Sequence, residues 1–177
     1  MNPTSLTIES ARCTACMACE LACSFTKEGF FSPAFSRIKV MQVYELGVNV
    51  PIACVHCADA PCLASCPSEA IVRDEVRGVV SIVAERCSAC GECVEACPYG
   101  AVHIPPEQEL AVLCDLCGGE PACVASCVYG ALRYERQPDA VYASLTVTTH
   151  GMDLPQKRWR VAEAVAERVG QAREAMP

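Results

Sequence analysis

Short runs of alternating apolar and polar residues predict a chain built from small strands. β-Branched residues alternate or cluster in four runs, and each is expected to form a short strand: 6–8, 79–83, 102–104 and 132–134. A longer alternation over 37–44, a turn at 45–47 and an apolar return over 48–52 predict a β-hairpin. Near the C-terminus, residues 156–175 predict an amphipathic helix whose apolar face holds the following residues: Trp159, Ala162, Val165, Val169 and Ala172. This helix either folds back over the body of the chain or docks onto a partner, with Trp159 as its anchor.

Ordinary apolar residues are too few to hold this fold by themselves. Leu, Ile, Val and Phe together number 40 of 177 residues, whereas cysteine alone supplies 16. No uncharged stretch exceeds 13 residues, fewer than the roughly 20 needed to cross a bilayer, and the N-terminal sequence has no export signal. We therefore expect a cytoplasmic protein without a membrane span. In that reducing compartment, the cysteines are expected to bind metal instead of forming disulfides.

The cysteines fall into four groups of four with none left over. The groups are Cys13, Cys16, Cys19 and Cys23; Cys54, Cys57, Cys62 and Cys66; Cys87, Cys90, Cys93 and Cys97; and Cys114, Cys117, Cys123 and Cys127. The first and third groups read C-x2-C-x2-C-x3-C, the ferredoxin pattern in which three thiolates bind one iron–sulfur cluster and the fourth binds its neighbour. The second and fourth groups lengthen the middle spacing and place a proline inside it, Pro61 and Pro121. The spacing therefore indicates fully ligated iron–sulfur clusters.

Full ligation by cysteine predicts electron transfer without catalysis, because such a cluster offers no open coordination site to a substrate. The sequence has no dinucleotide-binding, phosphate-loop or zinc-hydrolase motif. A structural zinc scaffold is the alternative from another class, since zinc also binds paired C-x2-C motifs. His56, inside the second group, either donates a hydrogen bond to a cluster sulfur or merely fills a turn. Tyr99 and Tyr129 either cover clusters from water or are ordinary core residues.

Internal similarity indicates how the groups combine. Residues 12–23 resemble 86–97, and 62–66 resemble 123–127, which indicates a duplicated half. The second and third groups both end in Cys-Pro, and 20 residues separate them, a spacing that favours one compact two-cluster module. We therefore expect an α+β fold of two nested ferredoxin-like 2[4Fe-4S] modules with short strands and helices. The inner module spans 54–104, the outer module comprises 1–53 and 105–138, and residues 139–177 form a C-terminal extension that contains the helix.

The charge of the chain narrows the class of partner. The formal net charge is −7, and four oxidised clusters with their thiolates add about −8. Up to residue 155 the chain has 9 basic and 18 acidic residues. This excess of negative charge argues against nucleic acid as a partner and favours a basic docking surface on a redox protein.

The motifs over residues 54–67 and 114–124 resemble those of a known family. Across roughly residues 5–135 the chain is similar to the four-cluster electron-transfer subunits of molybdenum or tungsten oxidoreductases, the dimethyl sulfoxide reductase B-subunit type. The resemblance implies four [4Fe-4S] clusters with nested ligand sets. These sets are Cys13, Cys16, Cys19 and Cys127; Cys114, Cys117, Cys123 and Cys23; Cys54, Cys57, Cys62 and Cys97; and Cys87, Cys90, Cys93 and Cys66.

Two runs, 19–40 and 114–119, are most similar to small subunits of tungsten aldehyde oxidoreductases and their benzoyl-coenzyme A reductase relatives. The resemblance implies a separate catalytic subunit with a tungsten- or molybdenum-pterin that oxidises an aldehyde. This chain would then pass electrons to a flavin or NAD-linked subunit or to a ferredoxin. The alternative partner is a soluble formate dehydrogenase, hydrogenase or sulfur-compound reductase. Because a row of clusters has two ends, end-to-end self-association is a further hypothesis.

Overall fold

The computed structural model describes residues 4–136 and 147–174. The strands are β1 (Thr4–Ile8), β2 (Lys39–Val43), β3 (Val48–Ile52), β4 (Ile71–Arg73), β5 (Val80–Ile82) and β6 (Leu132–Arg136). The helices are α1 (Ala18–Glu28), α2 (Pro61–Ala64), α3 (Glu92–Ala96), α4 (Ala122–Ala125) and α5 (Leu154–Glu174). The elements are small and mixed, as the sequence predicts. Parts of the expected outer module and C-terminal extension, at 1–3, 137–146 and 175–177, lie outside the described residues.

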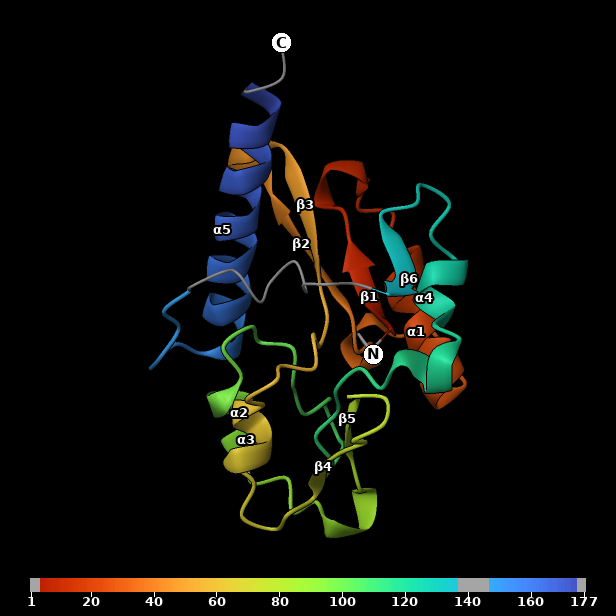
Figure 1. The fold of residues 1–177 in the computed structure, drawn as a ribbon, viewed down its shortest axis with the longest axis vertical. Helices are drawn as coiled ribbons and strands as arrows, with labels where there is room; N and C mark the ends of the chain where they lie inside the picture. The colour runs from red at the N-terminus through yellow and green to blue at the C-terminus, as the bar shows by residue number, and fades with distance from the viewer. Residues whose placement is uncertain (1–3, 137–146, 175–177) are drawn as a thin grey trace.

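Each of these strands pairs with one other strand, always antiparallel. β1 pairs with β6 in the register Thr4↔Arg136 to Ile8↔Leu132, which joins the two ends of the cysteine-rich region. β2 pairs with β3, and β4 pairs with β5. In Figure 1, β1 and β6 lie beside α1 and α4, whereas α2 and α3 lie at the lower left and β4 and β5 in the lower centre.

The expected hairpin over 37–52 is present as β2 and β3. A 3-10 turn over Tyr44–Leu46 and Gly47 in a left-handed conformation (φ 59°) reverse the chain between them. The expected strand over 102–104 is wrong, because this segment forms a single bridge, His103↔Val112. Pro105 and Pro106 follow at once, and neither has an N–H group with which to extend a ladder.

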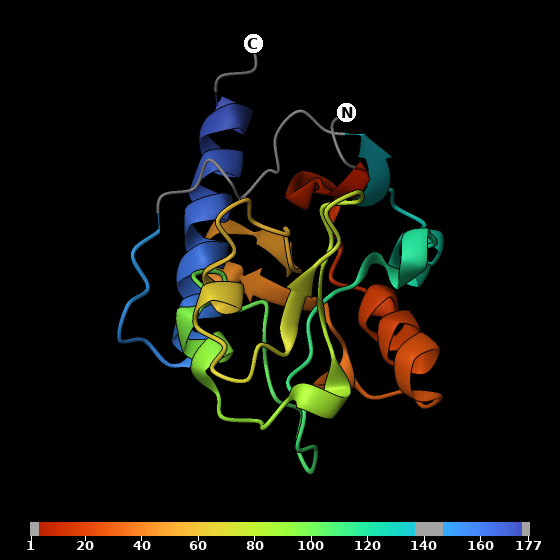
Figure 2. The same ribbon diagram turned by 60° about the horizontal axis from the view of Figure 1, so that its bottom comes forward.

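Helix α5 packs along the β2–β3 hairpin (Figures 1 and 2). Its buried face is formed by four small or branched residues: Val161, Ala162, Val165 and Ala166. Trp159, the expected anchor, is 38% exposed, so it lies at the edge of this contact and not in its buried centre. The expected helix is therefore present and folds back onto its own chain.

Two basic residues of α5 fix the helix to the turns that follow cysteines. The Lys157 ammonium, only 2% exposed, donates hydrogen bonds to the carbonyls of Val94 and Glu95 at the end of α3. Arg158 donates from Nε to the Gly100 carbonyl at 2.8 Å. A Cβ on Gly100 would lie 2.9 Å from the Arg158 side chain, so this close approach requires glycine.

The core has two apolar parts, and cysteines belong to both. One part includes Cys19, Cys23 and Cys123, and the other includes Cys62, Cys93 and Cys97. Within the described ranges, no helix is long and apolar enough to traverse a bilayer.

Candidate functional site: four cysteine-lined sites

The sixteen cysteines are all free thiols, and they differ in exposure. Six are buried: Cys19, Cys23, Cys62, Cys93, Cys97 and Cys123. Cys16 and Cys90 are exposed, and the others are intermediate. Each group of four therefore has cysteines at different depths, an arrangement that can surround a cluster of several atoms.

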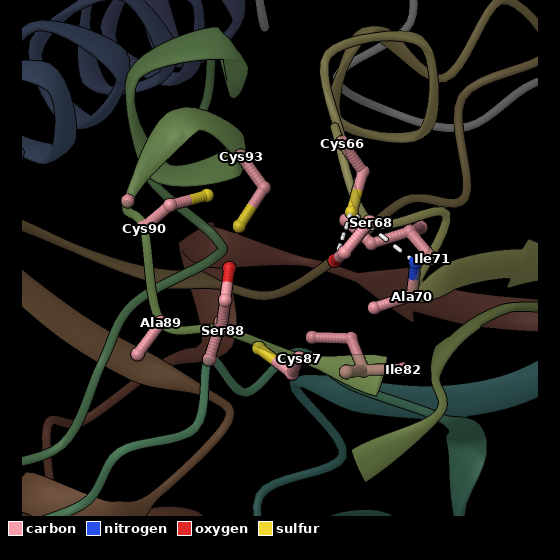
Figure 3. Close-up of a pocket in the computed structure, with 12 residues that line it drawn as sticks. Cys66, Ser68, Ala70, Ile71, Ile82, Cys87, Ser88, Ala89, Cys90 and Cys93 are labelled. Atoms are coloured by element: carbon pink, nitrogen blue, oxygen red, sulfur yellow. Dashed lines mark hydrogen bonds between the residues drawn. The ribbon is translucent and has the colours of Figure 1, made fainter. Parts of the chain in front are cut away.

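Cys66 lies with the third cysteine group, although it ends the second group in the sequence. It lines a cavity together with Cys87, Cys90 and Cys93, with about 320 Å³ of empty space when open solvent is included. Figure 3 shows these sulfurs approaching the cavity from two segments of the chain, and we call it site IV. Ile71 and Ile82, from β4 and β5, complete an apolar wall.

Cys97 likewise lies with the second group. It lines a cavity with Cys54, Cys57 and Cys62, which we call site III. His56 and Tyr99 are part of the wall of this cavity. The expected position of Tyr99 beside the cysteines is therefore present, whereas Tyr129 is 48% exposed.

A third cavity joins α1 to the fourth cysteine group. Cys23 lines it with Cys114, Cys117 and Cys123, and we call it site II. Charged side chains surround it: Lys27 pairs with Asp115 at 2.6 Å, and Arg37 pairs with Glu28 at 3.0 Å. Site II is therefore bordered by paired charges, whereas the residues lining site IV are uncharged apart from its cysteines.

The remaining four cysteines are Cys13, Cys16, Cys19 and Cys127, which we call site I. Burial raises the pKa of Cys13, and the nearby Cys127 and Cys16 add to the rise. Burial raises the pKa of Cys19 to about 12, with contributions from Glu20, Cys13 and Cys16. These effects indicate that Cys16, Cys19 and Cys127 each lie near Cys13.

Backbone N–H groups point at the sulfurs. The amide of Ala70 donates to Cys66 Sγ at 3.3 Å, and the amide of Ala101 donates to Cys97 Sγ at 3.4 Å. Arg37 N–H donates to Cys23 Sγ at 3.3 Å. A hydrogen bond to a thiolate favours its charged form. These three N–H groups therefore favour the thiolate, the form of cysteine that binds metal.

The raised pKa values of these thiols bear on whether the sites fit an iron–sulfur cluster. Burial raises the pKa of Cys57 and Cys93 to about 11 and of Cys114 to about 12, and neighbouring cysteines reinforce the rise. Four thiolates are unstable this close together unless cations neutralise them. Iron supplies that charge, and the cavities supply the space between the sulfurs, so the residues fit a [4Fe-4S] cluster. Among the described residues, no three His, Cys, Asp or Glu side chains are placed to hold one metal ion.

Electrostatic neighbours also reveal the order of the sites. Cys19 of site I raises the pKa of Cys123 of site II, after the larger effects of burial and of its own site. Burial raises the pKa of Cys54 of site III and of Cys93 of site IV, and the next largest rise comes from Cys114 of site II and from Cys62 of site III, respectively. These effects indicate that site I lies near site II, site II near site III, and site III near site IV.

Several residues around the sites could not be identified from the sequence pattern. Glu20, buried on α1, accepts a hydrogen bond from Val40 N–H at 2.6 Å. His103, also buried, has Nε2 at 3.2 Å from the Ala34 carbonyl oxygen. Both are polar residues at core positions, where an apolar pattern gives no signal.

Comparisons with known proteins find similarity to iron–sulfur proteins. The family described as "4Fe-4S dicluster domain" matches residues 47–137, just over half of the chain. Similar curated proteins include the "Aliphatic sulfonate oxidoreductase, polyferredoxin-like subunit" of Pyrococcus furiosus, 43% identical over 105 residues (59% of this chain and 60% of the relative). The "Electron transport protein HydN" of Escherichia coli K12 is 39% identical over 109 residues (54% and 57%). The "Thiosulfate reductase electron transfer subunit PhsB" of Salmonella typhi is 34% identical over 115 residues (60% and 58%).

This chain thus spans about 60% of the length of these relatives. Among solved structures, the active site complex BamBC of benzoyl coenzyme A reductase with 1,5-dienoyl-CoA contains a similar chain. The similarity covers 96% of this chain and 93% of that one, at 25% identity and a TM-score of 0.47. The family match includes β3 and the second, third and fourth cysteine groups. The chain belongs to the 4Fe-4S dicluster domain family.

Proposed function

We propose that the chain carries four [4Fe-4S] clusters, one at each of sites I to IV, and that the sixteen cysteines are their ligands. The observation that carries the proposal is the lining of sites II, III and IV, where each cavity takes three cysteines from one group and one from another. In this arrangement sites III and IV form the inner module, and sites I and II form the outer module. The family assignment favours iron–sulfur clusters over the zinc scaffold.

The chain is then an electron-transfer subunit of an oxidoreductase complex. A cluster bound by four protein sulfurs accepts and returns one electron at a time and leaves no iron open to substrate. Electrostatic effects of Cys19 on Cys123, of Cys114 on Cys54 and of Cys62 on Cys93 support an order in which each site lies near the next. Electrons can therefore cross the molecule from site I to site IV or in the reverse direction.

The proposed catalytic partner is a tungsten aldehyde oxidoreductase subunit, with a flavin subunit or a ferredoxin at the other end of the row. The similarity of residues 19–40 and 114–119 to small subunits of such enzymes supports this partner. The relative from P. furiosus, named for an aliphatic sulfonate oxidoreductase, supports a second candidate in which the catalytic subunit acts on a sulfonate. Self-association through the two ends of the row is tested by the mass of the complex, which stays at one copy per catalytic subunit if the ends do not pair.

Metal content and colour test the proposal directly. The chain is purified without oxygen together with any protein that binds it, and iron, zinc and tungsten are measured with the visible spectrum. We expect about 16 iron per chain and the broad absorption of [4Fe-4S] clusters. Four zinc per colourless chain would contradict the proposal.

Reduction by substrate then identifies the partner. If a larger, tungsten-containing subunit copurifies, an aldehyde added without an acceptor should bleach the clusters. Bleaching by an aliphatic sulfonate alone would favour the second candidate. A preparation reconstituted without this chain should keep its activity with an artificial dye, because the dye takes electrons directly from the catalytic subunit.

A further inference from the structure

One residue position recurs in all four C-x-x-C loops and is filled differently in one of them. The third residue of each loop adopts a left-handed backbone conformation: Ala15 (φ 54°), His56 (φ 51°), Ala89 (φ 52°) and Leu116 (φ 58°). Three of these side chains are aliphatic, so the conformation itself does not call for histidine. The imidazole at position 56 needs an explanation of its own.

The hydrogen bonds of the His56 ring determine which nitrogen carries its proton. Nδ1 lies 3.0 Å from the backbone nitrogen of Val80 and 3.8 Å from Cys54 Sγ. A backbone amide can only donate, so Nδ1 accepts the Val80 N–H and bears no proton of its own. In the neutral ring the proton is consequently on Nε2.

The Nε2–H group of His56 is buried and has no hydrogen-bond partner among the residues that the structure describes. Leaving such a donor unsatisfied in the protein interior is unfavourable. The ring also forms part of the wall of site III, beside Cys54, Cys57 and Cys62. A sulfur-containing group bound between these cysteines would bring acceptors to this wall.

We propose that the Nε2–H of His56 donates a hydrogen bond to a sulfur atom of the cluster held at site III, and that it raises the reduction potential of this cluster. The inference rests on the proposed function, because it requires a cluster at site III. Hydrogen bonds to cluster sulfurs stabilise the reduced, more negative state, and this is one of the ways in which a protein sets a cluster potential. The Val80 amide is the positioning group, since it fixes the tautomer and the orientation of the ring.

The chain itself provides the variants for a test. His56→Ala and His56→Leu place at this position the residue types that the equivalent left-handed position already has in the other loops, at Ala15, Ala89 and Leu116. His103→Gln is the matched control. His103 is also a buried histidine whose Nδ1 has no partner among the described residues, but it does not line the cavity of site III.

The measurement is a redox titration of each variant, followed by electron paramagnetic resonance, with iron content measured on the same samples. We expect unchanged iron, a lower midpoint potential for one cluster in both His56 variants, and unshifted potentials in His103→Gln. Unchanged potentials with full iron content would overturn the hydrogen bond and leave the proposed function intact. A wild-type chain without clusters would overturn both.

A second measurement does not depend on how the His56 variants fold. The wild-type chain is labelled with ¹⁵N in its three histidines, and the coupling of ¹⁵N to a reduced cluster is measured by pulsed electron paramagnetic resonance. We expect a histidine nitrogen coupling that persists in His103→Gln. Its absence from the reduced wild-type protein would overturn the inference, even if the His56 variants lose iron.

Discussion

Lys157 offers a test of how α5 supports the cysteine-bearing turns. Its ammonium is almost completely buried and donates to the carbonyls of Val94, at 3.2 Å, and of Glu95. Within a helix, the Val94 carbonyl would accept from residue 98, but Pro98 has no N–H group. Lys157 therefore satisfies a carbonyl that the backbone of α3 cannot. We predict that Lys157→Met loosens the contact between α5 and α3.

The size of the effect follows from these contacts. Each hydrogen bond from a charged donor contributes about 1.5–3 kcal/mol, so two contribute about 3–6 kcal/mol. Burial of the ammonium opposes this by several kcal/mol, and methionine keeps most of the side-chain volume. The expected net loss is about 2 kcal/mol, which corresponds to a roughly thirtyfold change in a local opening equilibrium.

Native-state hydrogen exchange of the anaerobic protein with its clusters measures this opening directly. Amides of α5 should exchange about thirtyfold faster in Lys157→Met, while those of the β1–β6 pair stay unchanged. Arg160→Met is the control, because Arg160 is on the same helix, is 54% exposed and pairs only with Glu163 among the contacts that the structure gives for its guanidinium. Equal exchange in the two variants would refute the role assigned to Lys157.

Three further predictions concern the sites and their surroundings. Asp115→Asn removes the carboxylate that pairs with Lys27 beside site II, so the potential of the cluster proposed there should rise in a redox titration; a fall would contradict this. Cys90→Ala should lower the iron content from about 16 per chain to about 12–13, and an unchanged iron assay would exclude Cys90 as a ligand. Burial and the nearby Arg158 lower the pKa of His103 to about 3 in the folded protein. Below about pH 6.5 the unfolded chain therefore binds more protons than the folded one, and the free energy of unfolding decreases, by about 2 kcal/mol at pH 5. The test measures the urea concentration that bleaches the clusters at pH 7 and at pH 5. The difference between the two should be smaller in His103→Gln than in the wild type, and the same difference in both proteins would argue against the role assigned to His103.

The sequence was informative where one physical requirement dominated. The cysteine spacing identified the groups, because ligands of one small cofactor must be close along the chain or brought together by a short turn. The alternation over 37–52 identified the β2–β3 hairpin, because one face of the hairpin packs on α5. In both cases the local pattern and the tertiary structure impose the same residue choice.

Helix α1 shows why other elements were missed. Its buried positions are Cys19, Glu20, Cys23 and Ser24, whereas Leu21 and Phe25 are exposed. The periodic apolar signal of a helix is therefore replaced by thiols and polar groups that hydrogen-bond or approach the sites. The burial of Lys157 was hidden for a related reason, since an isolated lysine on an amphipathic helix resembles the solvent-facing side.

The pairing of β1 with β6 also imposes an order on synthesis. The ladder joins Thr4 to Arg136, so it cannot close until the ribosome has released nearly the whole cysteine-rich region. The β4–β5 pair connects Ile71 with Ile82, only a short stretch of chain, and can close much earlier. During translation, Cys13 and its neighbours are therefore made well before β6, the strand that closes this ladder. Cells that make this protein would need to shield the N-terminal thiols while the middle of the chain matures first.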